Sequence, residues 1–131
     1  MDINEFIGLP YREGARGPEA YDCYGVVMAV YRAGLGIELP DWYADAPGPQ
    51  GASRAIAAAM TDEATRRQSV KVEAAEDFDI AVVGSSLRPH HVGVFMHGGV
   101  LHCSKAFGSV WQQMPRFTAL YPSVEFYRWH R

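Results

Sequence analysis

Cys23 stands in a sequence context that suits a catalytic nucleophile. It follows Asp22, where a loop rich in glycine and proline gives way to an apolar run. Asp22 is a good helix N-cap, so we predict that Cys23 is the first residue of a helix. The positive end of a helix favours thiolate over thiol and can lower a cysteine pKa from about 8.5 to roughly 3.5–7.5. Gly25 leaves room for a close approach to the thiol. The alternative is a buried cysteine that acts only as a small hydrophobic residue.

Two histidines that would serve this thiol lie in a predicted β-hairpin. Alternation of apolar residues predicts strands at 91–96 and 100–103, joined by a glycine-containing turn. His91 and His102 would then lie across from one another, or one diagonal apart, on one face of the sheet. Such a pair supplies a base and a residue that orients the base. His90 is left out because it points to the other face, and each histidine taken alone fits an ordinary surface or core position.

The five histidines also require that a metal site be considered. A structural zinc takes four nitrogen or sulfur ligands at short, characteristic spacings. The two cysteines, Cys23 and Cys103, are far apart in the sequence, and no predicted helix carries a His-x-x-x-His pair. We therefore predict neither a metal nor another cofactor. A regulatory disulfide between the two cysteines is not expected either, because Cys103 follows His102 and should face away from the site.

The elements that must position these residues fall into a helical first half and a β-rich second half. Helices are predicted at 2–7, 23–33 and 53–67, with a loop at 8–20 and an extended segment at 37–43. From residue 69 the apolar period changes to two, and strands are predicted at 70–72, 79–83, 91–96, 100–103, 109–113 and 124–129. Helices followed by an antiparallel meander predict an α+β fold, with the N-terminal helices packed on a C-terminal antiparallel sheet.

Composition narrows the classes of function. A chain of 131 residues that is 48% hydrophobic fits one globular domain, spanning 1–131. The net charge of −3 and the lack of a basic block argue against a nucleic-acid partner. The first residues are acidic, and no apolar run is as long as a membrane span, so we expect no signal peptide and no membrane insertion.

Two stretches together resemble the NlpC-type cell-wall peptidases, a family of small papain-like cysteine hydrolases. They are FIGLPYREGARGPEAYDCYGVVMAVYRAGLGIELP (6–40) and HHVGVFMHGGVLHCSKAFGSV (90–110). The specific feature is an Asp-Cys-x-Gly element followed later by a His-x-Gly strand. The resemblance implies a papain-like NlpC-type fold and a cysteine peptidase or amidase that hydrolyses peptidoglycan.

The resemblance also implies a role for each candidate site residue. Cys23 would be the nucleophile, His91 the general base and then acid, and His102 the orienting third residue. Tyr11 would line the site near the oxyanion, and Asp22 in some members meets an amine of the peptide substrate. No metal is implied.

Within the family, the sequence looks most like short members encoded in phage tail modules and gene transfer agents. In these members an aromatic residue follows the cysteine, as Tyr24 does here, and a sequence similar to LGIELPDW (35–42) follows the helix. The implied role is to cleave an amide bond in peptidoglycan stem peptides at the virion tail tip, after synthesis in the bacterial cytoplasm. Other tail-tip or baseplate proteins are the implied partners. Whether the bond is a sugar–peptide amide or a γ-linked peptide bond stays open.

The sequence departs from the family pattern at three places. Ala15 stands where a second glycine is usual, Tyr24 where wall-remodelling enzymes carry serine, and Phe78 where a glycine usually precedes the aspartate. A second hypothesis is therefore a tail-tip structural or assembly subunit that keeps the hydrolase fold. Exposed aromatic residues would be its contact anchors, and the candidates are Trp42, Tyr43, Trp111 and Trp129. The alternative is that these four side chains belong to the core.

Overall fold

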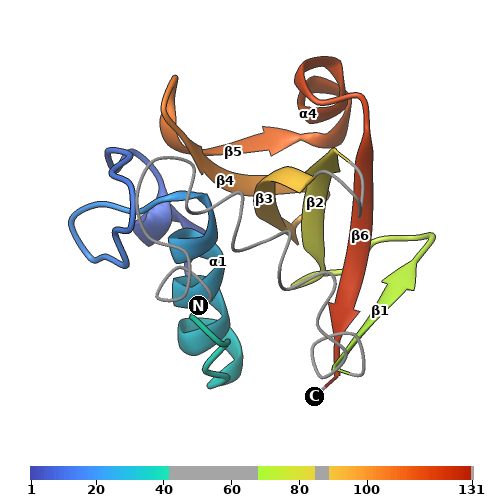
Figure 1. Cartoon of the computed structure of the whole chain (residues 1–131), viewed down its shortest axis with the longest axis horizontal. Helices are drawn as coiled ribbons and strands as arrows, with labels where there is room; N and C mark the ends of the chain where they lie inside the picture. The colour runs from blue at the N-terminus through green and yellow to red at the C-terminus, as the bar shows by residue number, and fades with distance from the viewer. Residues whose placement is uncertain (42–67, 85–88, 131) are drawn as a thin grey trace.

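The computed structural model describes residues 1–41, 68–84 and 89–130 (Figure 1). A six-stranded antiparallel sheet forms its centre. Helix α1 (Cys23–Leu35) packs on one face of the sheet, and the short helix α4 (Met114–Leu120) covers part of the other face. A 3-10 helix, η1 (Ile3–Phe6), precedes them within the predicted 2–7 segment. The predicted α+β architecture is confirmed.

The order of the strands differs in one respect from a simple meander. The strands are β1 (Ser69–Val72), β2 (Ile80–Gly84), β3 (Pro89–Met96), β4 (Gly99–Ser104), β5 (Gly108–Gln113) and β6 (Val124–Trp129). Their order in the sheet is β1-β6-β2-β3-β4-β5. Strands β2 to β5 form the predicted meander, but β6 returns and pairs with both β1 and β2. The prediction of a full meander is therefore wrong, because strand periodicity identifies strands and not their neighbours.

Helix α1 begins directly after the predicted cap Asp22 and ends two residues beyond the predicted 23–33. The Asp22 side chain accepts a hydrogen bond from the amide of Gly25, and Gly36 ends the helix in the left-handed region with φ of 67°. Every residue from Cys23 to Tyr31 is buried. This half of the helix packs against the β3 and β4 side chains Val92, Val94 and Leu101, and so fixes its first residue against the sheet.

Helix α4 was not predicted, although it covers the second face of the sheet. A proline in its first turn suits a helix start, but seven residues are too few to show a helical period. Its side chain Phe117 is fully buried against Ala81, Val83 and Val100. Figure 1 shows α1 and α4 well apart, with the sheet between them. Both faces of the sheet therefore carry apolar side chains, and α4 covers part of the second face.

Two predictions fall outside the described residues. These are the helix at 53–67 and the end of the extended segment, which contains Trp42 and Tyr43. In the parts of the chain that are described, no helix is both long and apolar enough to span a membrane.

Candidate active site

The candidate site lies where β3 and β4 separate. Pairing between these strands ends at Gly93 and His102, whereas β3 remains paired with β2 and β4 with β5 beyond that point. The amide of Phe95 donates to the carbonyl of Asp79, just before β2. Successive amides of an antiparallel strand point to alternate neighbours, so the amide of Val92 points toward β4. Since β4 has moved away there, this amide has no partner on β4, and it lowers the pKa of the Cys23 thiol.

His91 and His102 lie one diagonal apart on the sheet face that α4 covers. His102 pairs with Gly93, two residues from His91, which is one of the two predicted arrangements. A Cβ on Gly93 would come within 3.0 Å of the His102 Cβ, so glycine leaves room for the imidazole. His91 Nε2 lies 2.8 Å from His102 Nδ1, and both residues are buried. The side chain of His90 lies outside the described part of the structure.

Three residues that the sequence did not single out enclose the histidine pair. Tyr121 stacks on His91 with ring centroids 5.1 Å apart, and Phe117 meets His102 edge-on at 5.0 Å. Gln112 Oε1 lies 2.7 Å from His102 Nε2. Burial lowers the pKa of His102, and the hydrogen bond with Gln112 acts in the opposite direction. The enclosure therefore favours a neutral His102.

The thiol of Cys23 is much less acidic than the helix-end argument predicts. Its side chain is 4% exposed. Burial raises the pKa of the Cys23 thiol to about 12, and the charge of Asp22 acts in the same direction, while the amides of Val92 and Tyr24 lower it. The predicted low pKa is thus wrong for this structure, because lost hydration outweighs the helix end. A thiolate here needs a neighbouring group that accepts the proton.

Asp22 ties the 8–20 loop to the start of α1. Its fully buried carboxylate accepts hydrogen bonds from the amides of Gly14 and Gly25 and from Arg16 Nη1, at 3.1, 2.7 and 2.8 Å. A Cβ on Gly25 would lie 2.3 Å from the carbonyl oxygen of Ala15. Gly25 therefore admits the backbone of the loop, whereas the sequence suggested an approach to the thiol. A contact of Asp22 with a substrate amine stays a prediction.

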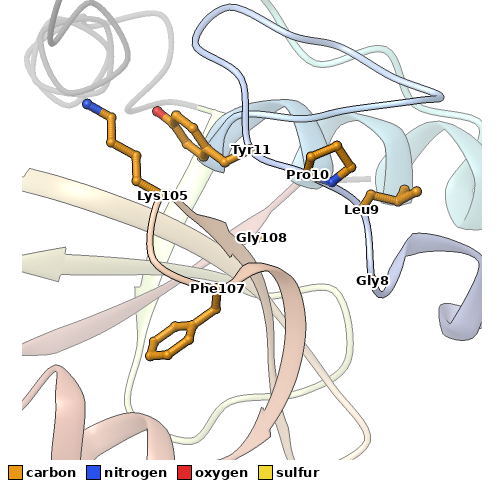
Figure 2. A pocket seen from close by; sticks show the side chains of 7 residues that line it. All are labelled: Gly8, Leu9, Pro10, Tyr11, Lys105, Phe107 and Gly108. Atoms are coloured by element: carbon orange, nitrogen blue, oxygen red, sulfur yellow. The ribbon is translucent and has the colours of Figure 1, made fainter.

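Tyr11 borders a pocket of about 500 Å³ (Figure 2). The other lining residues are Gly8, Leu9, Pro10, Lys105, Phe107 and Gly108. The Tyr11 hydroxyl donates to Glu13 Oε2 over 2.7 Å. The pKa of Tyr11 is raised by burial and by this hydrogen bond, with a further contribution from the charge of Cys23. The residues that line this pocket do not include Cys23, His91 or His102.

The comparison with family models identifies the fold to which this site belongs. The NlpC/P60 family model matches residues 8–115, which include Cys23, His91 and His102. The chain belongs to the NlpC/P60 family. A comparison with curated protein sequences found no match.

Solved NlpC/P60 structures share the fold. The NlpC/p60 domain of the peptidoglycan hydrolase SagA is 19% identical with a TM-score of 0.61, over 95% of this chain and 89% of that one. NlpC1 from Trichomonas vaginalis is 20% identical with a TM-score of 0.65, over 97% of this chain and 41% of that one. A lipoprotein-like NLP/P60 protein from Staphylococcus aureus is 18% identical with a TM-score of 0.57, over 98% and 39%. At these identities the likeness shows the fold, and the predicted NlpC-type papain-like class is confirmed.

The described residues of the NlpC/P60 domain hold no group of three or more histidine, cysteine or acidic side chains arranged for a metal ion. Both cysteines are free thiols. Cys103 donates to the carbonyl of Tyr21 over 3.3 Å, within the core on the α1 face. It therefore faces the opposite side of the sheet from its neighbour His102, as predicted.

Proposed function

We propose that this NlpC/P60 protein is a cysteine hydrolase that cleaves an amide bond in peptidoglycan stem peptides. The observation that supports the proposal is the hydrogen-bonded pair of His91 and His102 on β3 and β4, the two strands against which the helix that begins at Cys23 packs. Cys23 lies on the α1 face of the sheet, and the hydrogen-bonded pair of His91 and His102 lies on the α4 face. The name of the SagA structure, a peptidoglycan hydrolase, supports the choice of substrate.

The proposed reaction is an acyl transfer through a thioester. His91 accepts the thiol proton, and the Cys23 sulfur attacks the amide carbonyl carbon. His91 then returns the proton to the leaving amine, and a water that His91 deprotonates hydrolyses the thioester to the acid and the free thiol. His102 holds the proton on the far nitrogen of His91 throughout. Because burial keeps the thiol protonated, the thiolate arises only as a pair with the imidazolium of His91.

Two donors are proposed for the oxyanion of the tetrahedral intermediate. The amide of Cys23 lies in the first turn of α1, where amides have no acceptor within the helix. Tyr11 is the second donor, and its single hydroxyl hydrogen is directed at Glu13. The hydroxyl must therefore turn away from Glu13 when the substrate binds.

The pocket beside Tyr11 is proposed to hold part of the peptide. Lys105 places an ammonium group at this pocket, and Phe107 is 54% exposed. Stem peptides carry free carboxylates, which a lysine at the edge of the site would attract. Figure 2 shows Lys105 and Tyr11 extending from the ribbon beside this pocket.

Digestion of purified peptidoglycan tests the proposal. The wild type should release soluble peptides that mass spectrometry identifies, and Cys23→Ala should release none. Cys103→Ala is the matched control, because it removes the other buried thiol, which donates to the carbonyl of Tyr21. Equal release by Cys23→Ala and the wild type would contradict the proposed mechanism.

We further propose that the protein acts at the tail tip of a phage or gene transfer agent, beside other tail-tip or baseplate proteins. The support is the LGIELPDW text after the first helix. Immunogold labelling of purified particles should place the protein at the tail tip. Its absence from those particles would contradict this location.

One observation favours the alternative of a tail-tip structural or assembly subunit. The thiol is buried and its pKa is raised to about 12, as in an unreactive cysteine. Of the proposed anchors, Trp111 and Trp129 are half-buried and pack against the core, while Trp42 and Tyr43 lie outside the described residues. Alkylation of the thiol against pH separates the two functions. Reaction near neutral pH that His91→Ala abolishes supports the hydrolase, and equally slow reaction of both proteins supports the structural subunit.

A further inference from the structure

We infer that Gln112 is a positioning residue that fixes which nitrogen of each histidine carries its proton. Its meaning for catalysis rests on the proposed hydrolase function. The family resemblance accounts for Cys23, His91 and His102, whereas nothing in it assigns a role to Gln112 on β5.

The three side chains form a diagonal row across three neighbouring strands. His91 comes from β3, His102 from β4 and Gln112 from β5. His102 pairs with Gly93 on one side and with Val110 on the other. Each of its two hydrogen-bonding partners is therefore displaced by two residues, which keeps all three on one face of the sheet and within reach of long side chains.

The chemistry of the glutamine amide sets the direction of the hydrogen bonds. Gln112 Oε1, which only accepts, lies 2.7 Å from His102 Nε2, so this nitrogen carries a hydrogen. A neutral His102 then has its lone pair on Nδ1, which lies 2.8 Å from His91 Nε2. The Nε2 of His91 must therefore donate to the Nδ1 of His102. The lone pair of a neutral His91 is then left on its Nδ1. With hydrogen on Nε2 of both histidines, the Nδ1 of His91 is free to accept a proton, and His91 can act as a base.

The reverse order would disable the base. If the Nε2 of His102 accepted a hydrogen bond, its Nδ1 would carry the hydrogen and His91 Nε2 would have to accept. A neutral His91 would then carry a hydrogen on Nδ1 and could not take a proton from the thiol there. His102 is fully buried between the rings of Phe117 and Tyr121. Its tautomer is therefore set by its two hydrogen bonds, one with His91 and one with Gln112.

The surroundings of Gln112 suit a substitution test. Gln112 is half-buried and lines a pocket of about 480 Å³, together with Phe107, Val110, Arg116, Ala119 and Leu120. Leucine has a similar size to glutamine and finds apolar neighbours there. Gln113 is the matched control because it is the next residue along β5, is exposed, and makes no side-chain hydrogen bond at the start of α4.

Kinetics of peptide release give the first readout. Gln112→Leu should lower kcat about 10- to 100-fold with little change in KM, which is the usual effect of losing an orienting partner. Gln113→Leu should leave kcat unchanged. Gln112→Glu keeps the acceptor and should restore kcat at high pH. Its negative charge stabilises a protonated His102, which cannot accept from His91, so the acidic limb of its pH profile should move to higher pH. An unchanged kcat in Gln112→Leu would overturn the inference. Equal losses of kcat in Gln112→Leu and Gln112→Glu, with no shift of the pH profile in either, would overturn it as well.

Nitrogen-15 NMR of the imidazoles gives a readout that needs no substrate. In the wild-type chain of 131 residues, both His91 and His102 should carry hydrogen on Nε2. In Gln112→Leu, His102 should show a mixture of tautomers, and in Gln113→Leu the wild-type pattern should persist. Hydrogen on Nδ1 of His102 in the wild type would overturn the inference even if Gln112→Leu failed to fold. If the wild type released no peptide, the proposed function would fail, while this spectrum would still decide the proton order.

Discussion

The backbone amide of Val92, one residue along β3 from His91, lowers the pKa of the Cys23 thiol. A single strand thus supplies both an amide that lowers this pKa and the imidazole proposed to take the thiol proton. Because the amide belongs to the backbone, it persists in any variant that keeps β3 in place. Substitutions at His91 therefore remove the base without removing this amide.

The stability of the protein should fall in alkaline solution because of Cys23. Burial raises the pKa of this thiol to about 12 in the folded state, above the value of 9.0 for an unperturbed cysteine. The stabilisation is therefore fully present below about pH 9 and is lost as the pH rises toward 12. Urea unfolding at several pH values should show a steeper alkaline loss in the wild type than in Cys23→Ala, by up to about 1.4 kcal/mol per pH unit. Parallel curves would show that Cys23 ionises normally.

Arg16 should be important for stability because it neutralises a buried carboxylate. It lies 2.8 Å from Asp22, whose side chain is 0% exposed. Arg16→Leu leaves that charge unpaired and should lower the free energy of unfolding by about 3 kcal/mol. Arg32→Leu is the control, since it breaks an exposed pair with Glu38 and should change little. Denaturant unfolding measures both, and equal effects would show that burial of Asp22 is not decisive.

Gly25→Ala should destabilise the protein although alanine favours helices. The added Cβ would lie 2.3 Å from the carbonyl oxygen of Ala15, and the 8–20 loop would have to move. Helix propensity alone would stabilise the variant by about 1 kcal/mol. The sign of the change in melting temperature therefore decides whether the loop is held against α1. Activity should fall as well, since the loop carries Tyr11.

Reversal of the charge at Lys105 should weaken substrate binding and leave the chemistry intact. Lys105 lies on the turn between β4 and β5 and lines the pocket beside Tyr11. Lys105→Glu should raise KM for an anionic stem peptide about two- to fivefold, as expected for an exposed charge, with kcat unchanged. The same variant should show no change with a peptide whose carboxylates are amidated. An unchanged KM for the anionic peptide would exclude a contact with Lys105.

Local sequence signals predicted most of the fold and the central part of the site. Asp22 and Gly36 mark the ends of α1 by cap chemistry, and period-two alternation places β2 to β5 within a few residues of their observed bounds. The hairpin is tight, with His97 and Gly98 at positive φ between paired Met96 and Gly99. That turn fixes the register and so brings His91 and His102 together.

Features that depend on distant parts of the chain could not be predicted in this way. The return of β6 between β1 and β2 is a choice of neighbours that no local pattern encodes. Gln112 and Gln113 look alike in sequence, and only the register of β5 against β4 places the first beside His102. The high pKa of Cys23 has the same origin, because it depends on burial by the whole sheet and not on the helix end.

The position of β6 also has a consequence for the order of folding. The hairpins from β2 to β5 join residues that are close in sequence, so they close small loops and can form early. Strand β1 enters the sheet through β6, and Ser69 is paired with Trp129. On the ribosome, β1 must therefore wait until β6 has emerged, and until then β2 presents an unpaired edge to other nascent chains.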